Sequence, residues 1–109
     1  MGLDITFTRR KKIHCPECGT IIGHEDVDCV DSGGRVWYDV LEHIGYYVPY
    51  EQRTKENDWY GKDMTLTDAQ AEEIMQFLEK NSVFQENAIA GLIAMAKCKG
   101  HDVVINADW

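Results

Sequence analysis

The sequence predicts a small single α+β domain over residues 1–109, with a zinc-stapled β-hairpin near the N-terminus, two C-terminal helices and a C-terminal strand. Three observations carry this prediction. Residues 3–8 alternate apolar and polar side chains, which is the period of a half-buried strand. Residues 15–18 form a Cys-x-x-Cys turn followed by β-branched residues. Beyond residue 67, apolar residues recur at helical spacing after capping signals. A chain of 109 residues suits one hydrophobic core.

The N-terminal half contains the expected hairpin. The strand at residues 3–8 continues through the basic run 9–12 into the cysteine turn, and residues 20–22 suit the returning strand. We expect the acidic stretch 25–31 to be a loop and residues 32–34 to form a turn. A short helix from about Val36 to Ile44 would then place one apolar stripe inward, formed by Trp37, Leu41 and Ile44.

Two helices and a strand are expected in the C-terminal half. Residues 67–70 match a capping box, and Ser82 to Gln85 repeat the signal before a second helix. Because residues 88–96 are apolar nearly all round, we expect that helix to be buried. Gly100 is placed to end it in the left-handed conformation. Residues 102–106 then form a strand that could pair with residues 3–8.

Between the expected helices, residues 46–63 show no period and mix aromatic with charged side chains. We expect a long structured loop. Loops of this length in compact domains are often functional, and exposed aromatic side chains anchor protein interfaces. Tyr50, Trp59 and Tyr60 are therefore candidate partner contacts. The alternative is that these rings cover the core beneath them.

The charge balance points to a basic partner. The formal net charge is −8, and from residue 13 onward 18 acidic side chains accompany only 7 basic ones. Such a surface repels nucleic acid and anionic membranes and attracts basic proteins at low salt. An acidic face that only confers solubility is the alternative. The acidic candidates for partner binding are Glu25, Asp26, Asp28, Glu72, Glu73 and Glu79.

The turn Cys15-Pro16-Glu17-Cys18-Gly19 predicts a structural zinc site. A Cys-x-x-Cys bend supplies two thiolates, while Pro16 fixes one backbone dihedral and Gly19 permits a positive φ. A thioredoxin-like redox pair would begin a helix, which the β-branched residues that follow do not favour.

His24 and Cys29 are the expected third and fourth ligands. The series Cys15-x2-Cys18-x5-His24-x4-Cys29 resembles the zinc knuckle of retroviral nucleocapsid proteins, with one additional residue before the histidine. That resemblance implies nucleic-acid binding, and a zinc-knuckle nucleic-acid-binding accessory protein is the alternative function. Knuckles bind through surrounding basic and aromatic residues, whereas this segment is acidic, so we carry over the ligands alone.

Two other completions of the site stay open. Cys98-x2-His101 has ligand spacing of its own and would close a Cys₃His site if the last helix ended near the hairpin. His43, at the end of the short helix, is the other candidate ligand.

No catalytic signature is present. The zinc-deaminase, zinc-protease, phosphate-loop and serine-hydrolase motifs are all missing, so we expect a binding protein and not an enzyme. The N-terminal residues do not resemble a secretory signal, and no apolar run is long enough to cross a bilayer, which leads us to expect a cytoplasmic protein.

Over its whole length the chain resembles small proteins encoded by phages and prophages of Firmicutes, on the segments Met1 to Ile5, Ser32 to Tyr38 and Ile105 to Trp109. Among such proteins are the anti-CRISPR inhibitors of type II RNA-guided nucleases, and the chain is similar to a zinc-containing member in size, charge and zinc turn. The resemblance implies stoichiometric binding to the effector nuclease in the bacterial host cell, so that target DNA cannot load. It assigns no individual residue.

Overall fold

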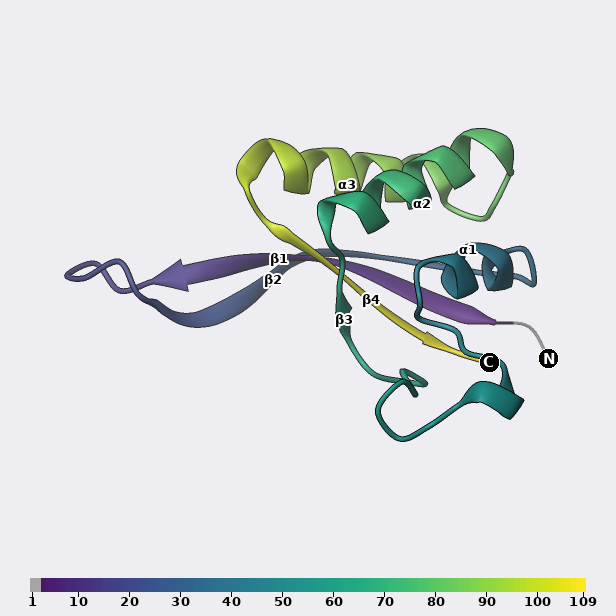
Figure 1. Cartoon of the computed structure of the whole chain (residues 1–109). Coiled ribbons are helices and arrows are strands. Elements are labelled where there is room, and N and C mark those ends of the chain that lie inside the picture. The colour runs from purple at the N-terminus through teal and green to yellow at the C-terminus, as the bar shows by residue number, and fades with distance from the viewer. Residues whose placement is uncertain (1–2) are drawn as a thin grey trace.

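Four strands form one antiparallel sheet, and helices pack against one of its faces (Figure 1). The structure is a computed structural model that describes residues 3–109. It confirms the α+β prediction; the zinc remains a prediction. The sheet order is β2-β1-β4-β3. The strands are β1 (Asp4–His14), β2 (Ile21–Gly33), β3 (Met64–Thr65) and β4 (Asp102–Asp108), and the helical segments are α1 (Trp37–His43), the 3-10 turn η1 (Tyr50–Gln52), α2 (Asp68–Lys80) and α3 (Glu86–Lys99).

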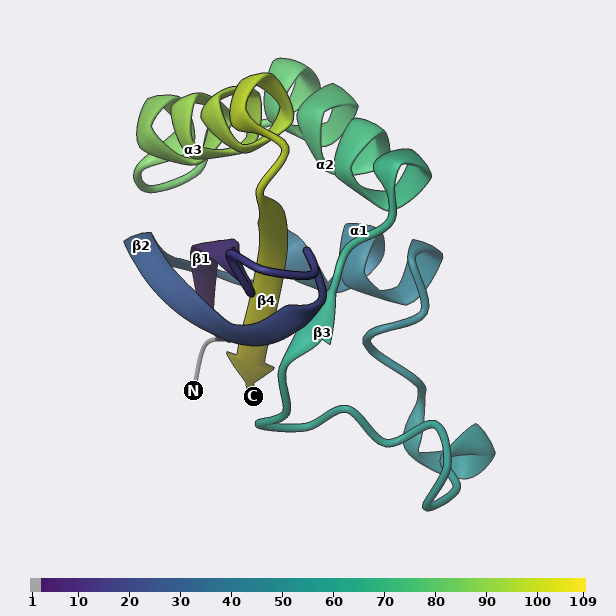
Figure 2. The ribbon, with the colours of Figure 1, turned by 90° about the vertical axis from the view of Figure 1, so that its left-hand side faces the viewer.

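The core lies between the sheet and the layer formed by α2 and α3 (Figure 2). Strand β1 is central because it pairs with β2 on one side and with β4 on the other, as expected for residues 3–8 and 102–106. Its Phe7 is fully buried against the Trp37 ring, with ring centroids 5.4 Å apart. Trp37 in turn lies 4.8 Å from Phe77 of α2. The expected inward stripe of α1 is confirmed, since Trp37, Leu41 and Ile44 are all buried.

The hairpin of β1 and β2 is longer than predicted. Its two strands pair from Asp4 with Gly33 to His14 with Ile21, whereas β4 accompanies β1 only as far as Arg10. Beyond Arg10 the hairpin leaves the sheet as a two-stranded arm (Figure 1). We define the arm as residues 11–25.

The loop expected at residues 25–31 is wrong: these residues belong to β2. Three of its acidic residues lie opposite the basic run of β1: Asp28 opposite Arg9, Asp26 opposite Arg10 and Glu25 opposite Lys11. The Arg10 Nε atom lies 2.8 Å from the Asp26 carboxylate. Cross-strand pairs of opposite charge favour the extended conformation in a segment whose composition alone is typical of a loop.

The capping box of α2 is confirmed. The Thr67 hydroxyl accepts from the Gln70 backbone N–H, and the Gln70 side chain accepts from the Thr67 N–H. The cap predicted at Ser82 to Gln85 is wrong. Helix α3 begins at Glu86 after Gln85, which has a left-handed conformation, and no side chain caps the helix. Gly100 ends α3 with a φ of 70°, as predicted.

Helix α3 is buried on one side only, which corrects the expectation of a helix buried all round. Ile89, Leu92, Ile93 and Ala96 face the core, while Met95 is 43% exposed. Alanine and glycine make up much of the outer side, and small side chains add little apolar area there.

The long loop between α1 and β3 is held by aromatic packing and by the buried Tyr46. The Tyr46 hydroxyl donates to the Lys62 carbonyl at 2.6 Å and accepts from the Ala107 N–H at 2.8 Å. The Arg53 guanidinium lies 5.5 Å from the centre of the Trp109 ring, and donates two hydrogen bonds to one backbone carbonyl of the loop. The loop is therefore ordered by contacts within itself and with the C-terminal residues 107–109, and the expectation of a structured loop is confirmed.

Candidate functional site

The two turn cysteines lie at the tip of the arm, next to each other and open to solvent. The Cys15 N–H donates to the Thr20 carbonyl at 2.7 Å, and the Gly19 N–H donates to the Cys15 carbonyl at 2.8 Å. Gly19 has a φ of 74°, the positive value that its position predicted. The Cys18 thiol lies 3.1 Å from the Thr20 hydroxyl. That hydrogen bond, followed by further hydrogen bonds that include Cys15, lowers the pKa of the Cys18 thiol.

The structure does not bring the other two expected ligands to this pair. His24 lies opposite Lys12, three residues along β2 from the residue that faces His14. Cys29 lies opposite Thr8, eight residues along β2 from Ile21. A strand advances about 3.3 Å per residue, so Cys29 is roughly 26 Å from the tip. Within residues 3–109 no three His, Cys, Asp or Glu side chains gather as a metal site.

The rival ligands are also distant from the tip. His101, at the end of α3, lies over the middle of β1, where the Arg9 guanidinium donates to its Nδ1 atom at 3.1 Å. Cys98 is exposed on the same end of α3. His43 lies 3.2 Å from Glu73 of α2. In the described part of the chain, none of these three residues belongs to a cluster of three or more potential metal ligands.

The nine candidate partner contacts fall into three separate places. Glu25, Asp26 and Asp28 lie on β2, where they face the basic residues of β1. Their negative charge is therefore balanced within the hairpin. The aromatic candidates lie in the loop on the far side of the sheet from α2 and α3 (Figures 1 and 2). Glu72, Glu73 and Glu79 lie on α2.

Among the aromatic candidates, Tyr50 alone projects freely. It is 85% exposed at the start of η1. Trp59 packs on Tyr46 with ring centroids 6.3 Å apart, and Tyr60 meets the Trp109 ring edge-on at 4.9 Å. Trp59, and in part Tyr60, therefore pack against other aromatic rings, as the alternative of rings that cover the core predicted.

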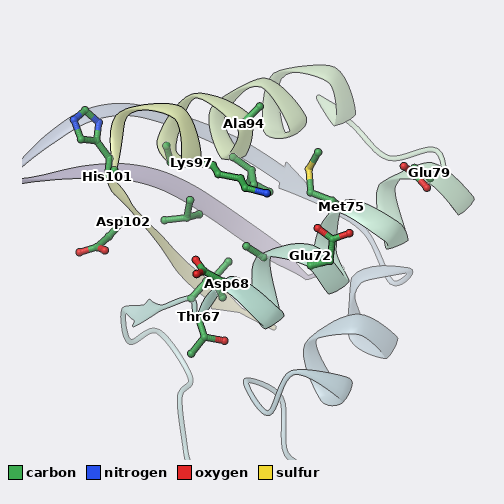
Figure 3. A pocket seen from close by; sticks show the side chains of 15 residues that line it. Thr67, Asp68, Glu72, Met75, Glu79, Ala94, Lys97, His101 and Asp102 are labelled. Carbon is green, nitrogen blue, oxygen red and sulfur yellow. The ribbon is translucent and has the colours of Figure 1, made fainter.

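A groove of about 600 Å³ runs between α2, α3 and the start of β4 (Figure 3). Its floor is apolar, and Met75 of α2 and Ile93 of α3 contribute to it. Three carboxylates from α2 stand along its rim, from Asp68, Glu72 and Glu79. We call this feature the acidic groove. Glu72 and Glu79 were predicted partner contacts, whereas Asp68 was missed. The sequence marks Asp68 only as an acidic residue in the first turn of a capped helix.

The charges around the acidic groove leave it negative. Within residues 3–109 none of its three α2 carboxylates forms an ion pair. Lys97 reaches across from α3 as the one lysine or arginine on the lining. Partial desolvation, then the positive charge of Arg9, lowers the pKa of His101, which disfavours a positive charge on this ring. Asp102 adds a further carboxylate, which lies 3.7 Å from the Lys12 ammonium group.

Comparison of the chain with protein families, curated proteins and solved structures finds no match. Of the helices in the described residues, none has the length and apolarity needed to cross a bilayer. The arm tip and the acidic groove must therefore be interpreted from their own chemistry.

Proposed function

We propose that this protein acts by binding a basic protein partner through the acidic groove. The single observation that carries the proposal is the row of Asp68, Glu72 and Glu79 above an apolar floor, with no intrachain ion pair in the structure described. An apolar floor with a charged rim is the general anatomy of a protein interface. A partner segment that carries lysine or arginine beside apolar side chains matches both parts of the groove.

The partner we propose is the nucleic-acid-binding lobe of a type II CRISPR effector nuclease in a bacterial host cell. A groove in a nuclease that normally receives phosphates is strongly basic, and a chain with a net charge of −8 competes with DNA for such a surface. This proposal rests on the resemblance to anti-CRISPR proteins together with the charge of the groove. It needs no catalytic step by this chain.

The nucleic-acid-binding alternative has less support. Each residue from Arg9 to Lys11 has an acidic residue of β2 opposite it, which reduces the positive field that phosphate binding requires. Zinc, which we propose binds at Cys15 and Cys18, would order the arm without making it basic. The partner-binding site and the zinc site that we propose would thus be separate parts of the molecule.

The test is binding of the purified chain to the purified nuclease at two salt concentrations. The double variant Glu72→Gln/Glu79→Gln should bind about tenfold more weakly at low salt, because two rim ion pairs contribute up to about 1 kcal/mol each. The matched control is Glu42→Gln/Glu56→Gln, which removes the same charge from exposed side chains outside the groove.

The control should bind like the unmodified chain, and the difference between the variants should shrink at high salt as charges are screened. No complex at low salt would refute the nuclease as partner. Equal weakening by both double variants would refute the groove as the binding site. Binding of the chain to single-stranded DNA, weakening steeply with salt, would instead favour the alternative function.

A further inference from the structure

We infer that the tip of the arm is half of a zinc site, and that the tip of a second copy of this chain completes it. Structural zinc takes four ligands in a tetrahedron, and each tip offers two thiols. Two copies related by a two-fold axis would therefore supply four cysteine ligands, Cys15 and Cys18 from each chain. The inference does not depend on the partner proposed for the acidic groove.

The first argument is the number of ligands. Hydrogen bonds from the Cys15 N–H and the Gly19 N–H close the turn, and the Cys15 and Cys18 thiols lie close enough to interact. Yet the described residues contain no group of three potential ligands, and Cys29 is eight residues away along β2. A zinc ion held by these two thiols needs two further ligands, which the described residues do not bring to the tip, so we assign them to another molecule.

The second argument is the apolar surface beside the thiols. Ile13, Ile21 and Ile22 are 38%, 46% and 65% exposed, and all three lie in the strands that lead into the turn. Ile13 and Ile21 belong to successive cross-strand pairs, so exposed isoleucines lie on both faces of the tip, and apolar side chains left open in this way are available for a contact. A second copy of the same tip presents the same isoleucines, so the contact is self-complementary, as a two-fold interface requires.

The third argument is access. The tip projects beyond the helices and the long loop, so that two tips can meet while the two bodies stay apart (Figures 1 and 2). The four residues 11–14 alone extend β1 by about 13 Å past the last pair with β4. This exceeds the screening length of about 8 Å at physiological salt, so repulsion between two acidic bodies is weak at that separation. The arm itself is balanced, because Lys11 lies opposite Glu25.

The experiment adds zinc alone to the metal-free full chain and measures molar mass by light scattering and bound zinc by elemental analysis. We expect the mass to double at one zinc ion per two chains, and a chelator to restore the monomer. Cys18→Ser should lose at least tenfold in zinc affinity and remain monomeric. The matched control Cys98→Ser, an exposed cysteine on α3, should behave like the unmodified chain.

Two further measurements keep the result decisive. Ile22→Ser should weaken the zinc-dependent dimer several-fold at fixed zinc, while Glu72→Gln/Glu79→Gln should leave it unchanged. The zinc-free unmodified chain gives the monomer reference even if a cysteine variant folds poorly. A monomer with one zinc per chain, a chain that binds no zinc, or a dimer that persists in chelator would each overturn the inference.

Discussion

Replacing Tyr46 by phenylalanine should destabilise the protein by removing one hydroxyl from the junction of the long loop and β4. That hydroxyl is the hydrogen-bond partner of both the Lys62 carbonyl and the Ala107 N–H, and the Tyr46 side chain is fully buried. Phenylalanine fills the same space but can neither accept nor donate. The ring packing against Trp59 and Trp109 would be kept.

The expected loss is about 2 kcal/mol in the free energy of unfolding. A buried polar group left without a partner costs about 1–3 kcal/mol, and this applies in full to the Ala107 N–H. The Lys62 carbonyl lies closer to the surface and regains a hydrogen bond from water, so it adds little. For a domain of this size the loss corresponds to a fall in melting temperature of roughly 8–15 °C.

Urea unfolding monitored by tryptophan fluorescence would measure the effect. The control is Tyr50→Phe, the same chemical change at a side chain that is 85% exposed, and it should alter stability by less than about 0.5 kcal/mol. A Tyr46→Phe variant as stable as this control would show that the hydroxyl does not hold the loop, and the account of the loop given above would then be wrong.

Two further outcomes follow from the same structure. Burial raises the pKa of Tyr46 above the ordinary tyrosine value of about 10, so the folded chain holds this proton more tightly than the unfolded chain, and the resulting contribution to stability is complete below about pH 10 and is lost as the pH rises through the folded-state pKa. Urea midpoints measured between about pH 9 and pH 11 should therefore fall more for the unmodified chain than for Tyr46→Phe. Equal falls in the two proteins would count against this cause. Thr67→Ala should cost about 1 kcal/mol by removing the α2 cap, whereas Ser82→Ala should be neutral within about 0.5 kcal/mol in the same urea assay, because no side chain caps α3.

Local signals in the sequence were enough to predict α2 and the core strands. Thr67 and Gln70 cap α2 through contacts three residues apart, which a sequence displays directly. Strand β2 was missed beyond its first residues because its stability depends on partners such as Arg10, sixteen positions before Asp26. The start of α3 was missed because Gln85 adopts a left-handed conformation that its residue type does not predict.

The candidate site divides in the same way. The Cys15–Cys18 bend is a local feature, and its position on a hairpin tip was predicted. Cys29 was expected beside the bend because its separation in the sequence is typical of a zinc ligand. In the structure the intervening residues form an extended strand, and eight residues of a strand span roughly 26 Å. The acidic groove is formed where α2 packs beside α3, so Asp68 gained its role from tertiary packing that no short segment reveals.

Strand β2 is an outer strand of the sheet, and its thirteen residues leave one row of backbone groups without a neighbouring strand. Such a row recruits strands of other chains into aggregates unless the sequence prevents it. Charged side chains and an interrupted register are two natural safeguards, and β2 has both: four carboxylates between Glu25 and Asp31, and a register shift at Asp28 to Asp26. The acidity of this strand thus guards its open edge against the addition of further strands, and the zinc-bridged contact that we propose would lie away from this edge, at the thiol-bearing end of the hairpin.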